Sequence, residues 1–213
     1  MKTVLCYGDS LTWGYDASGP GRHAYDDRWP SIVADALSGR VRVIAEGLNG
    51  RTTAYDDHLT AADRNGTRLL PTILATHEPV DILIIALGSN DLKRHTGGGR
   101  VFEAVRGVER LVEITRSFAS SFGYASPEIL IVSPPALVPT ADAAFDEMFG
   151  FAIEASNTFS QAYGRLAAEL GCHHVAASAV CEATPLDGIH LDAANTRKLG
   201  LAIAAALEPL LQD

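Results

Sequence analysis

The chain has 213 residues, 47% apolar and 20% charged, which fits one domain with a sizeable core better than two. Its formal net charge of −9 argues against nucleic acid as a main partner, because phosphate binding needs clustered lysine and arginine. Apolar runs are too short to span a bilayer, so no membrane partner is expected.

The cysteines give little sign of redox or metal chemistry. There are three, Cys6, Cys172 and Cys181, and their spacing fits neither a disulfide framework nor a zinc site. No signal peptide precedes the first apolar run, which begins at residue 3. We therefore expect a reducing, cytoplasmic location.

Strand-like and helix-like patterns alternate along the chain. In chain order the sequence predicts a strand at 3–6, a helix at 28–37, a strand at 41–45, a helix at 65–78, a strand at 81–87, a helix at 101–122, a strand at 128–133, a helix at 151–170, a strand at 172–176 and a helix at 192–211. This alternation predicts an α/β fold with a mainly five-stranded parallel sheet and helices on both faces, as a single domain over residues 1–213.

Residues 134–149 are the least regular part of the chain. They contain Phe145, Met148 and Phe149 without a clean period. The segment is expected to cover the substrate, to contact another subunit or to pack on the core. Its apolar residues favour a restricted, apolar pocket.

Polar side chains follow the predicted strands. Ser10 lies just past the first strand, where open α/β sheets place their ligand chemistry. Taken alone, this stretch fits an ordinary strand-to-helix turn with a capping serine equally well. Gly50 and Asn90 follow the second and third strands, and Asp187 and His190 share a short turn before the last helix.

Ser10, Asp187 and His190 occur in an order compatible with a catalytic triad. A serine hydroxyl is a weak nucleophile without a base, and His190 is the candidate base. A carboxylate at Asp187 would fix the imidazole tautomer and stabilise the imidazolium. The backbone N–H groups of Ser10 and Gly50 and the side-chain amide of Asn90 are candidate donors to an oxyanion.

Several neighbouring residues receive other roles. Trp13, three residues after Ser10, is expected to line the substrate pocket. Asp9 is expected to bond loop backbone, because adjacent side chains on extended backbone point apart.

The acidic and histidine residues at 56–58 and 173–174 lack the spacing of a helical zinc motif, so neither a metal nor another cofactor is expected.

A second hypothesis is a non-catalytic α/β module that binds a nucleotide or phosphate with its glycine-bearing loops. That class carries Gly-x-Gly-x-x-Gly after the first strand or a Gly-Lys-Ser/Thr motif, and the chain has neither. Nor would such a module require Asp187 and His190.

Gly8-Asp9-Ser10-Leu11, Gly50, Gly88-Ser89-Asn90-Asp91 and Asp187-Gly188-Ile189-His190 together resemble the sequence blocks of the SGNH (GDSL) hydrolase family. The runs at 8–15 and 46–53 are similar to its branch of small bacterial arylesterases and acyltransferases. In such proteins the loops at 16–27, 94–99 and 134–149 shape the pocket.

The resemblance implies a three-layer flavodoxin-like fold without a metal. It assigns the nucleophile to Ser10, the acid and base to Asp187 and His190, and the oxyanion donors to Gly50 and Asn90. It also implies hydrolysis of small short-chain carboxylic esters, aryl acetates among them, and acyl transfer to alcohols or peroxide. Members of the branch assemble as homo-oligomers, octamers among them.

Overall fold

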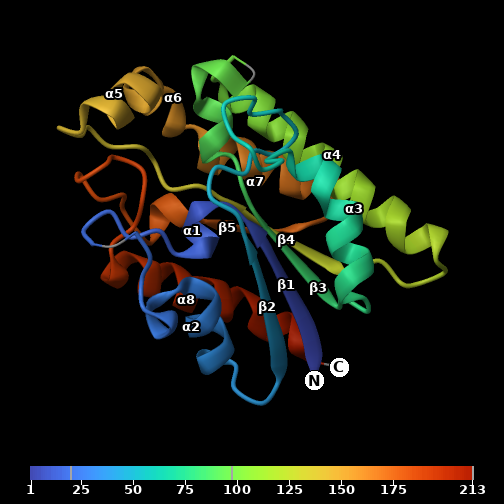
Figure 1. Ribbon diagram of the computed structural model, residues 1–213. Helices are drawn as coiled ribbons and strands as arrows, with labels where there is room; N and C mark the ends of the chain where they lie inside the picture. The colour runs from blue at the N-terminus through green and yellow to red at the C-terminus, as the bar shows by residue number, and fades with distance from the viewer. Residues whose placement is uncertain (20, 97, 213) are drawn as a thin grey trace.

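The protein is built on one sheet of five parallel strands. The computed structural model describes residues 1–19, 21–96 and 98–212. The strands are β1 (Lys2–Gly8), β2 (Val41–Gly47), β3 (Ile82–Ala86), β4 (Glu128–Ser133) and β5 (His173–Ala176). Their order across the sheet is β2-β1-β3-β4-β5, and every pair of neighbours is parallel (Figure 1). The predicted α/β fold is confirmed, with the strand order of the flavodoxin-like class.

Helices cover both faces of this sheet. On one face lie α2 (Trp29–Ala36) and α8 (Ala193–Leu207), and on the other lie α3 (Gly66–His77), α4 (Val101–Ser121) and α7 (Phe159–Leu170) (Figure 1). The shorter helices are α1 (Ser10–Trp13), α5 (Ala143–Phe149) and α6 (Ile153–Ser156). Single 3₁₀ turns are η1 (Tyr25–Asp27), η2 (Ser89–Leu92), η3 (Arg94–Thr96), η4 (Gly150–Ala152), η5 (Ala177–Ala179) and η6 (Glu208–Leu211).

The central strand β3 shows why the sheet is buried on both sides. Ile82 and Ile84 pack into the core under α2 and α8, while Leu83 and Ile85 pack into the core under α3, α4 and α7. Successive side chains on a strand point to opposite faces, so a continuous apolar run suits a strand covered twice.

The largest departure from the sequence prediction lies between β4 and β5. The helix expected at 151–170 begins only at Phe159, because η4 and α6 form a separate short unit before it. The irregular segment at 134–149 contains α5, whose N-cap Asp142 accepts hydrogen bonds from the amides of Ala144 and Phe145. The N-cap predicted at Asp192 is confirmed, since its side chain accepts from the amide of Asn195.

The topology sets the place of the candidate site. The chain leaves β1 for β2 on one side and later returns to β3 on the other, so β1 and β3 flank the switch point where ligands bind in open α/β sheets. The start of β1 and the 3₁₀ turn η6 lie together at the opposite end of the sheet, where Lys2 donates to the carbonyl of Leu210. Within the part of the chain that the structure describes, no helix is long and apolar enough to cross a membrane.

Candidate active site

Ser10 is the first residue of α1, directly after β1. The side chain that caps this helix belongs to Asp9, whose Oδ1 accepts a hydrogen bond of 3.0 Å from the amide of Leu11. The backbone-bonding role predicted for Asp9 is therefore confirmed. The Ser10 hydroxyl does not cap the helix and lies 2.9 Å from Nε2 of His190, 180 residues further along the chain.

His190 and Asp187 form a tight turn at the same end of the sheet. Nδ1 of His190 lies 2.6 Å from Oδ2 of Asp187, and Oδ1 of Asp187 accepts the amides of Ile189 and His190 at 3.1 and 2.9 Å. Burial raises the pKa of Asp187, but these hydrogen bonds and the His190 ring lower it more, so the pKa lies below its ordinary value. An ionised Asp187 favours the Nδ1–H tautomer of His190, in which Nε2 presents a lone pair to the Ser10 hydroxyl.

Gly50 and Asn90 line the same cleft as Ser10. Gly50 has φ of +79°, a left-handed conformation that favours glycine. Nδ2 of Asn90 donates to the carbonyl of Arg51 at 3.2 Å and to Oδ2 of Asp9 at 3.4 Å. Asp9 and Arg51 therefore fix the orientation of the Asn90 amide, which lines the same cleft as Ser10.

A second buried carboxylate supports these loops. Asp91 accepts the amide of Thr53 at 3.1 Å and its hydroxyl at 2.5 Å, which joins the loop after β2 to η2. Burial raises the pKa of Asp91 to about 7, against the effect of the Thr53 hydrogen bonds. Burial likewise raises the pKa of Asp9 to about 6. The carboxyl groups of Asp9 and Asp91 are both buried within the protein.

Two aromatic rings enclose the imidazole of His190. The Tyr15 ring stacks on it with centroids 4.1 Å apart, and Phe145 meets it edge-on at 5.9 Å. Tyr15 lies just past the left-handed Gly14, which ends α1 and turns the chain back toward Ser10.

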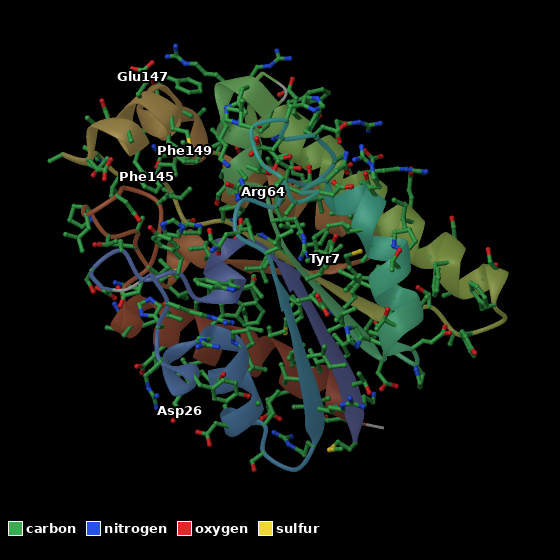
Figure 2. The ribbon with its side chains drawn as sticks, viewed as in Figure 1. Tyr7, Asp26, Arg64, Phe145, Glu147 and Phe149 are labelled. Carbon is green, nitrogen blue, oxygen red and sulfur yellow. The ribbon has the colours of Figure 1, made fainter. Side chains whose placement is uncertain are left out.

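These groups open into one cleft of about 180 Å³. Figure 2 shows Arg64, Phe145 and Phe149 around this end of the sheet. The described lining residues are Ser10, Tyr15, Asn49, Gly50, Arg64, Asn90, Lys93, Phe145, Met148, Phe149, Ile189 and His190.

The lining brings together Ser10, Gly50, Asn90 and His190, with Asp187 directly behind His190. Trp13 is not among the described lining residues; Arg22 stacks over its ring at 4.3 Å. The substrate contact predicted for Trp13 therefore stays a prediction without support from its position.

Of the three loops expected to shape the pocket, only 134–149 supplies described lining residues, through α5. Pro20 in the first loop and Gly97 in the second lie outside the described residues. The sequence reasoning missed Tyr15, Arg64 and Lys93. A usable signal existed only for Tyr15 and Lys93, which each lie within five residues of a recognised block.

The two aspartates weighed as metal ligands, Asp56 and Asp57, have other partners. Asp56 pairs with Arg68 at 2.6 Å, and Asp57 faces Arg64 and Lys93. Across the described ranges, no group of three or more His, Cys, Asp or Glu side chains is arranged to hold a metal ion.

Comparison with known proteins identifies close relatives. The model of the GDSL-like lipase/acylhydrolase family matches residues 6–197. A solved carbohydrate acetylesterase family member from Sinorhizobium meliloti is 52% identical, covers 99% of both chains and superposes with a TM-score of 0.94. Est24, a carbohydrate acetylesterase from Sinorhizobium meliloti, is 38% identical over 99% of this chain and 100% of its own, with a TM-score of 0.92.

The aryl esterase of M. smegmatis is 36% identical over 99% of this chain and 100% of its own, with a TM-score of 0.91. A comparison with curated protein sequences gave no match. The family model and the solved relatives agree with one another and cover nearly the whole chain. The chain therefore belongs to the GDSL-like lipase/acylhydrolase family.

Proposed function

We propose that this carboxylic ester hydrolase works through an acyl-enzyme on Ser10. The observation that carries the proposal is the hydrogen-bonded line from Ser10 Oγ through His190 to Asp187, at 2.9 and 2.6 Å, in a cleft with one apolar wall. A hydroxyl, a base and an orienting carboxylate in this order form the arrangement that serine nucleophiles need.

In the first half of the reaction, Ser10 Oγ attacks the ester carbonyl carbon and its proton passes to His190 Nε2. The carbonyl oxygen becomes an oxyanion, to which the N–H groups of Ser10 and Gly50 and the Asn90 amide donate. Nδ2 of Asn90 carries two hydrogens and contacts the Arg51 carbonyl at 3.2 Å and Oδ2 of Asp9 at 3.4 Å; the oxyanion would replace the longer contact, the one with Asp9. His190 then protonates the leaving alkoxide, and the bond to the alcohol breaks.

In the second half, water attacks the acyl-enzyme while His190 takes its proton. The tetrahedral intermediate collapses, the carboxylic acid leaves, and His190 returns the proton to Ser10. Each transfer uses the same imidazole, which Tyr15 and Phe145 hold in place.

The cleft favours small substrates. Its volume of about 180 Å³ is below the range of about 300–1,000 Å³ typical of sites for drug-sized ligands. Phe145, Met148, Phe149 and Ile189 give it an apolar wall. Together with the carbohydrate acetylesterases and the aryl esterase among the relatives, this supports acetyl and other short-chain esters as substrates, with a sugar or phenol as the alcohol.

Hydrolysis of 4-nitrophenyl acetate by wild type and Ser10→Ala tests the assignment. We expect turnover by wild type and at least about a 10³-fold lower kcat in the variant, with an unchanged circular dichroism spectrum. A Ser10→Ala enzyme with the wild-type rate would contradict it. A nucleotide-binding module, the hypothesis that the family does not favour, would instead give no turnover and a nucleotide-dependent thermal shift.

Four further statements about the protein are also proposals. Acyl transfer to alcohols or peroxide is supported by the apolar wall, which lowers the advantage of water over a less polar acceptor. A homo-oligomer is supported by exposed Phe102 and Phe151, and light scattering would test it. A cytoplasmic location rests on the sequence expectation alone, as does the assignment of residues 1–213 to one catalytic domain.

A further inference from the structure

Two cationic side chains line the cleft that holds Ser10. Lys93 follows η2, three residues after Asn90, and Arg64 lies two residues before α3. A methyl group on Gly50 would fall 2.6 Å from Nη1 of Arg64, so the guanidinium packs directly against the backbone beside Ser10. Figure 2 shows Arg64 at this end of the sheet, across from Phe145 and Phe149 of α5.

The carboxylate of Asp57 contacts both cations. Oδ2 of Asp57 lies 3.4 Å from Nη1 of Arg64 and 3.5 Å from Nζ of Lys93. Its Oδ1 accepts the amide of Leu59 at 3.1 Å and lies 3.2 Å from Nε2 of His95. Asp57 is therefore shared among several donors, and its charge is divided between two cations.

Both cations have hydrogen-bonding capacity left over. Nε of Arg64 is buried and has no hydrogen-bond partner among the residues that the structure describes. The ammonium of Lys93 carries three N–H donors, and its contact with Asp57 is a long one. Burial lowers the pKa of Lys93, while Asp57 raises it, so a further anion nearby would favour the charged form.

No acidic side chain in the described part of the chain lines the cleft. Asp9 and Asp91 lie behind Asn90, and Asp187 lies behind His190. One wall of the cleft is therefore cationic and the other is apolar. One buried donor without a partner, Nε of Arg64, lies in a pair of cations whose donors are not all used, and this arrangement is complementary to an anion that accepts several hydrogen bonds.

We propose that the cleft selects esters that carry a carboxylate near the scissile bond, with Lys93 and Arg64 as the residues that determine this specificity. A carboxylate fits because guanidinium and ammonium donors bind it with charge-assisted hydrogen bonds, and a planar guanidinium can bind both of its oxygens. The inference rests on the proposed function, since it names the substrate class of the same site.

Matched ester pairs test this inference. In one pair the carboxylate lies on the alcohol side: 4-acetoxybenzoate against 4-acetoxybenzamide. In the other it lies on the acyl side: the 4-nitrophenyl monoester of adipic acid against 4-nitrophenyl hexanoate. The measured quantity is the ratio of kcat/KM for the charged ester to kcat/KM for the neutral one, which cancels changes common to both.

We expect at least one pair to show a ratio that falls about tenfold in Lys93→Met and in Arg64→Met, the size of a partly buried ion pair. Lys93→Arg should retain most of the wild-type ratio because it keeps the charge. Arg110→Met, which removes an exposed arginine of α4, is the matched control and should leave the ratio unchanged. Equal ratios in wild type, Lys93→Met and Arg64→Met for both pairs would overturn the inference.

A measurement on wild type alone covers the case in which a variant does not fold. Benzoate should inhibit 4-nitrophenyl acetate hydrolysis at a concentration about tenfold lower than benzamide. Equal inhibition, or stronger inhibition by benzamide, would overturn the specificity while leaving the esterase assignment intact. Absence of any 4-nitrophenyl acetate hydrolysis would instead contradict the proposed function.

Discussion

Four side chains contact the imidazole of His190. Asp187 and Ser10 bind its two nitrogens, Tyr15 covers one face and Phe145 meets it edge-on. In the proposed mechanism, a ring fixed in this way is already oriented for proton transfer, so little rearrangement is needed when the substrate arrives. Two substitutions separate the effect of the carboxylate from that of the aromatic face.

Asp187→Asn should lower kcat for 4-nitrophenyl acetate by about 10³–10⁴-fold. An amide in place of the carboxylate no longer stabilises the imidazolium, and its N–H₂ favours the tautomer that presents N–H rather than a lone pair to Ser10. Asp26→Asn, which changes an exposed carboxylate to the same amide, is the control and should keep the wild-type rate. A rate for Asp187→Asn within threefold of wild type would rule out its role.

Tyr15→Leu should lower kcat by about 2- to 30-fold, corresponding to a cation–π energy of about 0.5–2 kcal/mol that develops as the imidazolium forms. Tyr15→Phe keeps the aromatic face and should retain most of the rate. The two kinetic constants distinguish the explanations: loss of a pocket wall raises KM, whereas loss of imidazolium stabilisation lowers kcat. Equal kcat values for Leu and Phe would contradict the stacking argument.

At the scale of elements, the loops after β2 and β3 are joined by the buried Asp91 and Thr53. With its pKa raised to about 7 by burial, Asp91 keeps a proton in the native state that the unfolded chain has lost above about pH 4. The native state therefore binds more protons between about pH 4 and 7, and the free energy of unfolding falls as pH rises through this window.

Asp91→Asn removes this titration. Relative to the variant, wild type should lose up to about 4 kcal/mol of stability between about pH 4 and 7, and the difference should then level off. Thermal denaturation midpoints measured at several pH values check the prediction, with Asp26→Asn expected to follow wild type. A difference between wild type and Asp91→Asn that is constant over this range would show that Asp91 titrates normally.

Most elements could be predicted because their signals are local. β3 is a continuous apolar run, and α8 begins at an Asp192 whose side chain caps it. The break between α6 and α7 had no such signal, because residues 151–170 keep a helical apolar pattern through it. The 3₁₀ turn η4 and the cap of α5 at Asp142 depend on how this segment packs over the end of the sheet.

The residues of the candidate site likewise fall into those with a local sequence signal and those without one. Ser10, Gly50, Asn90, Asp187 and His190 stand in recognisable blocks, so they could be named before their contacts were known. The positions of Tyr15 and Arg64 depend on packing between distant parts of the chain. Tyr15 stacks on the His190 ring, 175 residues away, and the Arg64 guanidinium packs against Gly50. Spacing from Ser10 alone favoured Trp13, since the reversal of the chain at Gly14 is a property of three-dimensional structure.

At the scale of the whole molecule, the first and last thirds of the chain pack together. Trp29 of α2 lies in one core with Leu199 and Ile203 of α8, and Lys2 donates to the carbonyl of Leu210 at 2.7 Å. Because the single sheet has a core on each face, neither face can be removed without exposing β1 and β3.

We therefore expect one cooperative unfolding transition. Both tryptophans, Trp13 and Trp29, lie near the start of the chain, whereas helical ellipticity reports on all of it. Urea midpoints from tryptophan fluorescence and from circular dichroism should coincide. Separate midpoints would indicate that the N-terminal part unfolds independently and would contradict a single domain.

The central claim, that Ser10 is the nucleophile, is tested most directly by covalent labelling with a 4-nitrophenyl organophosphonate. Mass spectrometry of wild type should show one phosphonyl group per chain, on the peptide that contains Ser10. Ser10→Ala should gain no mass under the same conditions. An adduct on a different residue, or equal labelling of Ser10→Ala, would contradict the account.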